Sequence, residues 1–290
     1  MPTILIAGGT GLVGIRLSHL LSEKGHTVLH LSRKKDPTAQ FPAFRWDTSS
    51  GFIEDEAIER ADYIINLAGT GIADKPWTAA RKKLIIDSRV DTTLLLKTYI
   101  ERKKTPLKAY IAASAVGYYG SRGDQLLVED DPPGKKGFLA ESVGIWEEAI
   151  KKVADTGVRM AAVRIGIVLS TKGGALEKIL LPFQFFNGAY FGDGQQWMSW
   201  IHMDDLCRMF IEAIENEQIK GFYNGVAPNP SRNKDLVYSA NRRSFSPLLP
   251  LPCGPPWAKW RTWYLKAPGH RQKKSSAPDS ASSFLNCCPL

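Results

Sequence analysis

The fold class that this sequence predicts is α/β, with a parallel sheet covered by helices on both faces and a smaller lobe after it. Short apolar, β-branched runs alternate with amphipathic stretches through the first two-thirds of the 290 residues, which is typical of strands joined by crossover helices. The first run, "ILIAGGTGLVG", breaks into glycine close to the chain start. From Ile167 onward the alternation gives way to a segment rich in aromatic residues and glycine, as expected of a lobe that shapes a pocket.

The elements follow from these runs in chain order. The expected strands are Thr3–Ala7, Thr27–Leu31, Tyr63–Leu67, Ala109–Ala113 and Arg159–Ile165. The expected helices lie near Leu12–Lys24, Trp77–Arg102 and Ala140–Thr156, and Gly25 closes the first of them because glycine relieves a C-terminal helical turn. Within the lobe, a helix from Asp204 to Glu215 precedes a short strand, "GFYNGVA".

The charge of the chain is unevenly distributed. The formal net charge is +9, but residues 241–290 alone carry eight Lys or Arg and one acid, so the rest of the chain is nearly balanced. This distribution argues against a nucleic-acid partner, since no folded basic face is evident. No apolar run is long enough to span a membrane, no secretory signal is present, and the four cysteines have no disulfide or zinc spacing, so we expect a cytoplasmic protein without a metal.

The glycine run is the strongest ligand signal. Gly8, Gly11 and Gly14 follow a strand and open a helix in a β-α-β unit, which is the setting that gives such a pattern meaning. The first glycine permits the tight turn, the second lets a pyrophosphate approach the backbone, and the third lets helix and strand pack closely. We therefore expect a dinucleotide here, with a glycine turn that binds no ligand as the alternative.

The end of the second strand discriminates between nucleotides. An NAD-binding protein usually has an acidic side chain there for the ribose hydroxyls, whereas this chain has Ser32, Arg33 and Lys34. A guanidinium pairs with a 2′-phosphate that a carboxylate would repel, and Asp36 lies further along the loop. NADP is therefore the predicted cofactor. Leu67, Ala68 and Gly69 end the next strand in "INLAG", where the adenosine could pass close to the backbone.

Six separated motifs carry a family resemblance over residues 1–237. In order and spacing, "AGGTGLVG", "INLAG", "SAVGYYG", "VRIGIVLS", "GDGQQWMSWIHMDDL" and "YNGVAP" resemble atypical short-chain dehydrogenase/reductases. The similar branch is the NAD(P)-dependent, nucleoside-diphosphate-sugar epimerase-like family, which also carries the name SulA-type cell-division inhibitor. The resemblance implies a Rossmann domain over residues 1–165 that binds NADP and a substrate lobe over 166–237 that is interleaved with the sheet. The implied cofactor contacts are Gly8, Thr10, Gly11, Leu12, Gly14, Ser32, Arg33, Leu67, Ala68, Gly69, Arg89 and Ile167.

The chain departs from this family at the catalytic pair. Members of the family usually carry Tyr-x-x-x-Lys on the helix that follows the strand ending in a serine, here Ser114. The tyrosine acts as the acid and base. Counting back from Glu147 puts Leu139 and Val143 at those two positions, and neither can transfer a proton. Ser114 occupies the serine position and could orient a substrate carbonyl.

Other polar side chains are candidates for the missing chemistry. Tyr118 and Tyr119 follow the serine strand and could donate a proton, although buried tyrosines with satisfied hydroxyls are commoner. His202 beside Asp204 and Asp205 resembles a relay, but we expect Asp204 to cap the following helix and His202 to pack beneath the lobe. Further candidates are Glu141, which is more simply a solvated helix residue, and the loop residues Gln195, Gln196, Trp197 and Trp200.

The last fifty residues are anomalous. They hold eight of the 18 prolines, three of the four cysteines and three of the eight tryptophans, without helical or strand periodicity. The resemblance leads us to expect another helix and a basic strand instead. We therefore interpret residues 238–290 as a Pro/Ser/Cys-rich tail produced by a frameshift, which one uninterrupted coding frame shared with close relatives would contradict.

Two functions remain open at this point. The first is an NADP-dependent oxidoreductase or epimerase acting on a small carbonyl, hydroxyl or sugar-nucleotide substrate by hydride transfer. The second is a non-catalytic NADP-binding sensor or regulatory protein, which the missing Tyr-x-x-x-Lys pair favours. Short-chain reductases often pair through the helices flanking that position, so by analogy a homodimer is expected.

Overall fold

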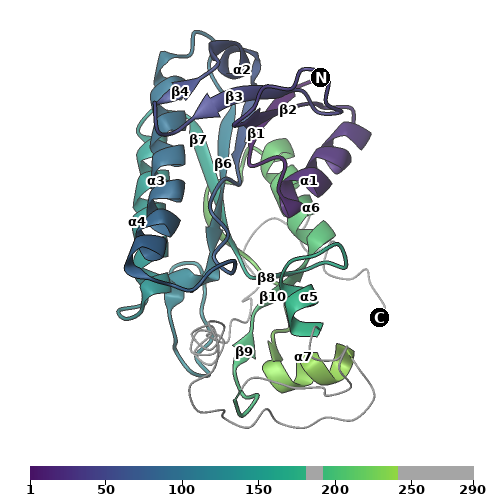
Figure 1. Ribbon diagram of the computed structural model, residues 1–290, viewed down its shortest axis with the longest axis vertical. Helices are drawn as coiled ribbons and strands as arrows, with labels where there is room; N and C mark the ends of the chain where they lie inside the picture. The colour runs from purple at the N-terminus through teal and green to yellow at the C-terminus, as the bar shows by residue number, and fades with distance from the viewer. Residues whose placement is uncertain (181–191, 241–290) are drawn as a thin grey trace.

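The computed structural model describes residues 1–180 and 192–240. An eight-stranded sheet runs through it in the order β11-β7-β6-β5-β1-β2-β3-β4 (Figure 1). All neighbours pair in parallel except β3 and β4, which form an antiparallel edge. The strands are β1 (Thr3–Ala7), β2 (Thr27–Ser32), β3 (Ala43–Asp47), β4 (Phe52–Ile53), β5 (Tyr63–Asn66), β6 (Ala109–Ala115), β7 (Arg159–Ile165) and β11 (Gly221–Gly225).

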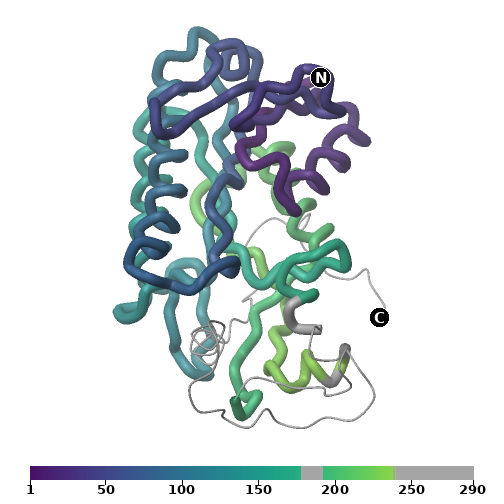
Figure 2. Tube along the Cα trace, viewed as in Figure 1, coloured from purple at the N-terminus to yellow at the C-terminus, as the bar shows by residue number. Residues whose placement is uncertain are grey.

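Helices cover the sheet on both faces. One face carries α3 (Ala79–Arg102) and α4 (Phe138–Ala154), which pack against each other, with the short α2 (Asp55–Arg60) beside α3. The opposite face carries α1 (Leu12–Glu23) and α6 (Met203–Glu215), which lie side by side although about 190 residues separate them (Figure 2). The predicted doubly wound α/β fold of the Rossmann type is thus confirmed.

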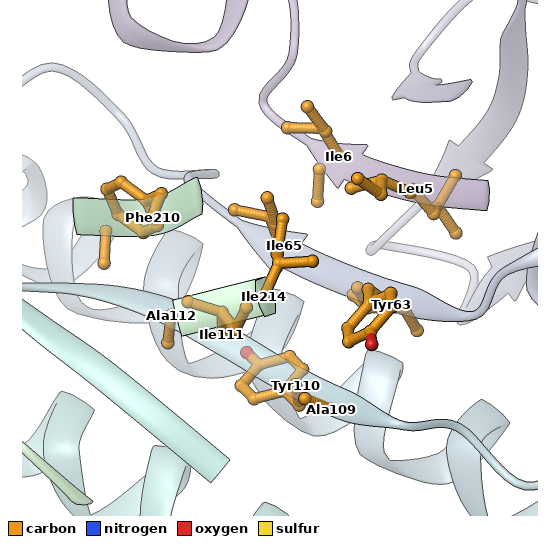
Figure 3. Packing of buried hydrophobic residues seen from close by; sticks show 14 of the residues in the cluster. Leu5, Ile6, Tyr63, Ile65, Ala109, Tyr110, Ile111, Ala112, Phe210 and Ile214 are labelled. Atoms are coloured by element: carbon orange, nitrogen blue, oxygen red, sulfur yellow. The ribbon is translucent and has the colours of Figure 1, made fainter. Parts of the chain in front are cut away.

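The core lies between the sheet and these helices. β1, β5 and β6 are almost continuously buried because helices cover both of their faces. Phe210 and Ile214 of α6 pack over them from one side, close to Ile65 and Ile111 (Figure 3). The loops at the carboxyl ends of β1, β5 and β6 start from this buried layer.

The remaining elements form a smaller layered region beyond the sheet. It holds two short sheets, made of β8 (Ile167–Leu169) with β10 (Trp200–His202) and of β9 (Trp197–Met198) with β12 (Ser231–Arg232). It also holds α5 (Ala175–Leu180) and α7 (Asn233–Ala240), and a 3-10 turn, η1 (Val116–Tyr119), follows β6. The predicted lobe over 166–237 also contains β11, which joins the main sheet, and α6, which packs on it. Most of the anomalous tail, residues 241–290, lies outside the described residues.

Most predicted elements agree with the structure to within two residues. The sequence analysis did not include β3, β4 and α2, of which the two strands extend the sheet past β2. Nor did it include η1, α5, α7 and the four short strands β8, β9, β10 and β12. The predicted helix start at Trp77 moves to Ala79, because the Thr78 side chain accepts a hydrogen bond from the Arg81 amide and caps the helix there. Gly25 has φ +87°, as its role at the end of α1 requires.

Candidate functional site

The glycine loop lies where the strand order reverses, between the carboxyl ends of β1 and β5. In open α/β sheets this switch point is the usual ligand crevice. Gly8 has φ +80°, and a Cβ atom there would lie 2.9 Å from the Ala68 nitrogen. The Gly11 amide donates to the Gly8 carbonyl at 3.0 Å, and a Cβ on Gly14 would overlap that oxygen and lie 2.7 Å from the Gly9 Cα. Two of the four glycines, Gly8 and Gly14, are therefore required by backbone packing alone.

The start of α1 is open to an anion. Its N-cap is Gly11, so no side chain occupies the first amides, and its first turn contains no acidic residue. Thr10 and Gly11 are exposed and Leu12 is half-buried. A helix N-terminus in this state offers backbone N–H groups and a positive dipole end to a phosphate.

His30 of β2 lies directly beneath this loop, and the sequence reading missed it. The imidazole is 4% exposed, and its Nε2 lies 2.7 Å from the Ser18 hydroxyl, which itself donates to the Gly14 carbonyl at 2.7 Å. When that hydroxyl donates to the Gly14 carbonyl, the imidazole donates to the Ser18 oxygen and carries its proton on Nε2. The only sequence signal for His30 is a titratable residue inside an otherwise apolar strand.

Burial lowers the pKa of His30 to about 4 from its ordinary 6.5, with desolvation as the cause. Between these two values the unfolded chain binds a proton that the folded protein does not, so acidification destabilises the fold. We expect the His30 contribution to be intact above pH 6.5 and to fall by about 3 kcal/mol as the pH reaches 4. Urea denaturation at pH 7, 5.5 and 4.5 for wild type and His30→Gln tests this, and equal losses in the two proteins would contradict it.

The end of β2 exposes a cation near the loop. Ser32 is half-buried, while Arg33 and Lys34 are exposed. Among the residues that the structure describes, Arg33 has no ion-pair partner, whereas the next cation, Lys35, pairs with Glu54 at 2.9 Å. Asp36, the nearest acid, accepts hydrogen bonds from the amides of the following turn and is not directed at the crevice.

The "LAG" turn after β5 is held from below. The Asn66 side chain is buried, donates to the Tyr110 hydroxyl at 2.9 Å and accepts from the Ala68 amide at 3.1 Å. The Leu67 amide donates to the Ala7 carbonyl at 2.8 Å, which joins this turn to the end of β1. Leu67 and Ala68 therefore lie against the end of β1 and the glycine loop, and the contact of residues 67–69 with adenosine stays a prediction.

Arg89 of α3 adds a second cation beside this turn. Its Nη1 donates to the carbonyls of Thr70 and Ile85 at 3.1 and 3.0 Å, and its guanidinium carbon lies 5.1 Å from the centre of the Trp146 ring. Burial and the nearby Arg81 lower the pKa of Arg89 to about 10. In the described part of the chain no carboxylate pairs with Arg89. A bound anion would therefore offset the free-energy cost of burying its positive charge.

Aliphatic side chains occupy the positions of the family's catalytic pair. Leu139 and Val143 are 8% and 5% exposed and lie on the face of α4 that meets η1. A Cβ on Gly117 would be 3.4 Å from the Leu139 Cβ and 3.6 Å from a Val143 methyl. The two residues thus pack against the turn after β6, and neither carries a group that can move a proton.

Ser114 and Tyr119 belong to a buried hydrogen-bond network. The Ser114 hydroxyl donates to Glu147 at 2.6 Å, and Glu147 forms a two-pronged ion pair with Arg164 at 2.8 and 2.9 Å. Arg164 also donates to the Tyr119 hydroxyl at 2.8 Å, and that hydroxyl donates to Asn224 at 2.7 Å. Tyr119 is 0% exposed and burial raises its pKa to about 12. This geometry favours a structural role for both residues over the catalytic role expected from the sequence.

Tyr118 contacts the same ion pair from outside. The guanidinium carbon of Arg164 lies 3.8 Å from the centre of the Tyr118 ring, a cation–π contact. Tyr118 remains half-buried. All three residues predicted to be catalytic therefore surround Glu147 and Arg164, and Tyr118 alone keeps part of its side chain accessible.

The expected arrangement around His202 needs correction. His202 is exposed, and its Nδ1 accepts from the Asp204 amide at 3.2 Å, so the histidine itself caps α6. Asp204 instead binds Arg16 of α1 through two hydrogen bonds of 2.7 and 3.0 Å, which lower the pKa of Asp204. Asp205 is exposed and pairs with Arg208, and Glu141 is an exposed helix residue. None of these residues faces another as a relay would.

Ile167, Trp197 and Trp200 lie in the smaller region beyond the main sheet, each in its own surroundings. Ile167 starts β8 and is half-buried, with its amide donating to the Ser199 carbonyl at 2.7 Å, and Trp200 lies opposite it on β10. Trp197 donates to Asp124 at 2.6 Å and is covered by the Arg232 guanidinium at 4.1 Å. Trp197 is therefore already stacked within the protein, while Gln195 is exposed and Gln196 buried.

Two features are absent from the described residues. They contain no group of three or more His, Cys, Asp or Glu side chains arranged to hold a metal ion. None of the helices in residues 1–180 and 192–240 is both long and apolar enough to cross a membrane.

A doubly wound sheet with a bare glycine loop at its switch point defines a dinucleotide-binding α/β protein. The chain belongs to the NAD dependent epimerase/dehydratase family, whose model matches residues 4–224. The resemblance to nucleoside-diphosphate-sugar epimerase-like, atypical short-chain dehydrogenase/reductases is thereby confirmed.

Individual relatives agree with this assignment. Epimerase family protein YfhF of Bacillus subtilis (strain 168) is 35% identical over 252 residues, which cover 86% of this chain and 82% of its own length. The crystal structure of human epimerase family protein SDR39U1 (isoform 2) with NADPH is 34% identical with a TM-score of 0.74, covering 85% of this chain and 82% of that one. The nucleoside-diphosphate sugar epimerase from Corynebacterium glutamicum is 32% identical with a TM-score of 0.75, covering 98% of this chain and 54% of that one.

Proposed function

We propose that this protein binds NADP and transfers a hydride to or from a small carbonyl, hydroxyl or sugar-nucleotide substrate, as an oxidoreductase or epimerase. The observation that carries the cofactor choice is the end of β2, where Arg33 is exposed without an ion-pair partner in the described chain and the nearest acid is engaged in its own turn. A 2′-phosphate would supply the missing partner for that guanidinium. The NADPH in the human relative supports the same choice.

The chain's own residues divide the dinucleotide between them. The glycine loop and the first amides of α1 would hold the pyrophosphate, and Ser32 with Arg33 the 2′-phosphate. The turn over residues 67–69 would take the adenosine side, and Arg89 would supply positive charge beside that turn. Ile167 would border the nicotinamide end. When bound, the cofactor supplies or accepts the hydride.

Replacing Arg33 by alanine is expected to raise the Kd for NADPH about 10- to 100-fold, because a charge-assisted hydrogen-bond pair to the 2′-phosphate is lost. The Kd for NADH should stay within about twofold of its wild-type value, since NADH has no phosphate there. Titration by nicotinamide fluorescence measures both. Lys34→Ala, which removes the neighbouring exposed cation, is the matched control. An equal loss of NADPH affinity in both variants would contradict a specific contact with Arg33 and indicate a general effect of positive charge.

The second candidate function is a non-catalytic NADP sensor or regulator. It is favoured by Leu139 and Val143 at the catalytic positions and by the burial of the Ser114 and Tyr119 hydroxyls. Incubation of NADPH deuterated at C4 with ketones and aldehydes, and of NADP+ with alcohols and sugar nucleotides, separates the two functions. Deuterium in a reduced product, reduction of NADP+ by an alcohol or an epimerised sugar supports the enzyme. Tight cofactor binding with none of these products supports the sensor.

A further inference from the structure

The surface beneath Gly9 is made by one imidazole ring. A Cβ atom on Gly9 would lie 2.6 Å from both Cγ and Nε2 of His30 and closer still to Cδ2, and these are its three nearest atoms. Within residues 1–180 and 192–240, and apart from the two chain neighbours of Gly9, no other group stands as close to that position. Gly9 is the one glycine of the loop whose lack of a side chain is required by another side chain and not by backbone.

The ring has little freedom to move away. His30 pairs with Ala43 on one side and Ile6 on the other within the sheet, and it is 4% exposed. Phe41 covers it, with ring centres 5.4 Å apart. The hydrogen bonds through Ser18 to the Gly14 carbonyl tie the imidazole to the first turn of α1. One side chain from β2 thus supports the loop at both Gly9 and Gly14.

We propose that His30 is a positioning residue for the dinucleotide, which holds the Gly9–Gly14 loop in its phosphate-binding shape and is the reason why residue 9 is glycine. The proposal rests on cofactor binding at this loop, as set out under the proposed function. His30 would touch no part of the cofactor and would act only through the backbone above it. A loop that already has its binding conformation loses less conformational entropy when the ligand binds, so the affinity is higher.

The surroundings keep the imidazole neutral. Its pKa is lowered by desolvation alone, with no charged group contributing. A second histidine, His19, half-buried on α1, also contacts Phe41, with its ring centre 5.2 Å from that of Phe41. A neutral ring adds no charge beneath the dinucleotide, so it leaves the positive end of the α1 dipole unopposed at the loop.

Two ligands, one with a pyrophosphate and one without, test this positioning role. NADPH needs the pyrophosphate site at the loop, whereas 2′-AMP carries only adenosine and the 2′-phosphate. We expect His30→Ala to raise the Kd for NADPH about tenfold and to leave the Kd for 2′-AMP within about twofold. His30→Gln keeps an N–H within reach of Ser18 and should recover most of the NADPH affinity. His19→Ala, which removes the other histidine on Phe41, should change neither Kd.

A second-site test addresses Gly9 itself. Gly9→Ala alone should raise the Kd for NADPH about a hundredfold, because the added methyl group and the fixed imidazole cannot share the space. In the double variant Gly9→Ala/His30→Ala the space is free, so the affinity should return to about that of His30→Ala. Equal affinities for Gly9→Ala with and without His30 would overturn the proposal.

The outcomes separate this inference from the cofactor assignment. If wild type binds neither NADPH nor 2′-AMP, the proposed function fails and the histidine is not at issue. If wild type binds both and His30→Ala binds both equally well, the cofactor assignment stands and the positioning role is refuted. If His30→Ala weakens both ligands to the same extent, the residue serves the fold in general, and the positioning role is likewise refuted.

Discussion

Replacing Glu147 by glutamine is expected to lower the free energy of unfolding by about 3–5 kcal/mol, the largest stability change that we predict. Glu147 is 0% exposed and forms a two-pronged ion pair with Arg164, whose own side chain is 4% exposed. The substitution keeps the shape but leaves the guanidinium buried without its counter-charge. Urea denaturation of both proteins at neutral pH measures the difference.

The reason for this magnitude is the number of elements that meet at the pair. Glu147 comes from α4, Arg164 from β7, Ser114 from β6, Tyr119 from η1 and Asn224 from β11. Their hydrogen bonds link three strands of the sheet to α4 and η1. Removing the charge of Glu147 therefore also disturbs the other polar groups of this network. Glu148→Gln is the matched control, because the neighbouring Glu148 is exposed and pairs with the exposed Lys151. That variant should change stability by less than about 0.5 kcal/mol, and a similar loss in both would contradict the buried-pair account.

Replacing Gly14 by alanine is expected to weaken NADPH binding by at least a hundredfold, the largest effect on ligand affinity that we predict. The added methyl group would overlap the Gly8 carbonyl oxygen and lie 2.7 Å from the Gly9 Cα. Both contacts are with backbone, so relief requires α1 to move away from the loop, and the first amides of the helix move with it. A loss of at least a hundredfold in NADPH affinity follows if the shift costs about 3 kcal/mol.

A second glycine in a helix provides the control for this substitution. Gly144 lies within α4, and a Cβ atom there would meet nothing within 4 Å. Gly144→Ala should leave NADPH affinity unchanged and raise stability by about 0.5–1 kcal/mol, because alanine loses less backbone entropy in a helix. Fluorescence titration and thermal denaturation of the two variants give the comparison. Retained binding in Gly14→Ala would mean that the loop does not hold the pyrophosphate.

The three catalytic predictions show where local reasoning reached its limit. Ser114, Tyr118 and Tyr119 stand after a strand that ends at the crevice, and from the sequence this position suggests chemistry. In the structure their side chains contact an ion pair whose members lie 33 and 50 residues from Ser114. A motif gives the position of a residue along its strand, but the partners of its side chain come from other elements.

Asp204 illustrates the same limit at a helix start. An acidic residue before an apolar periodic stretch is a common cap, and the sequence supports that interpretation. The structure gives the cap to His202 because Arg16 of α1 binds both oxygens of Asp204. Arg16 is 188 residues away, so only the packing of α1 against α6 could reveal the competition.

The sequence by itself determined the alternating α/β architecture, the glycine loop, the cation after β2 and the absence of Tyr-x-x-x-Lys from the helix α4. Each of these is written in residues close together in the chain, through periodicity or through spacing within one turn. Tertiary structure alone decided that His30 supports the loop, that Glu147 and Arg164 engage Ser114 and both tyrosines, and that Asp204 binds Arg16. Those outcomes depend on which distant side chains share a buried space and on which polar groups must find partners once water is excluded.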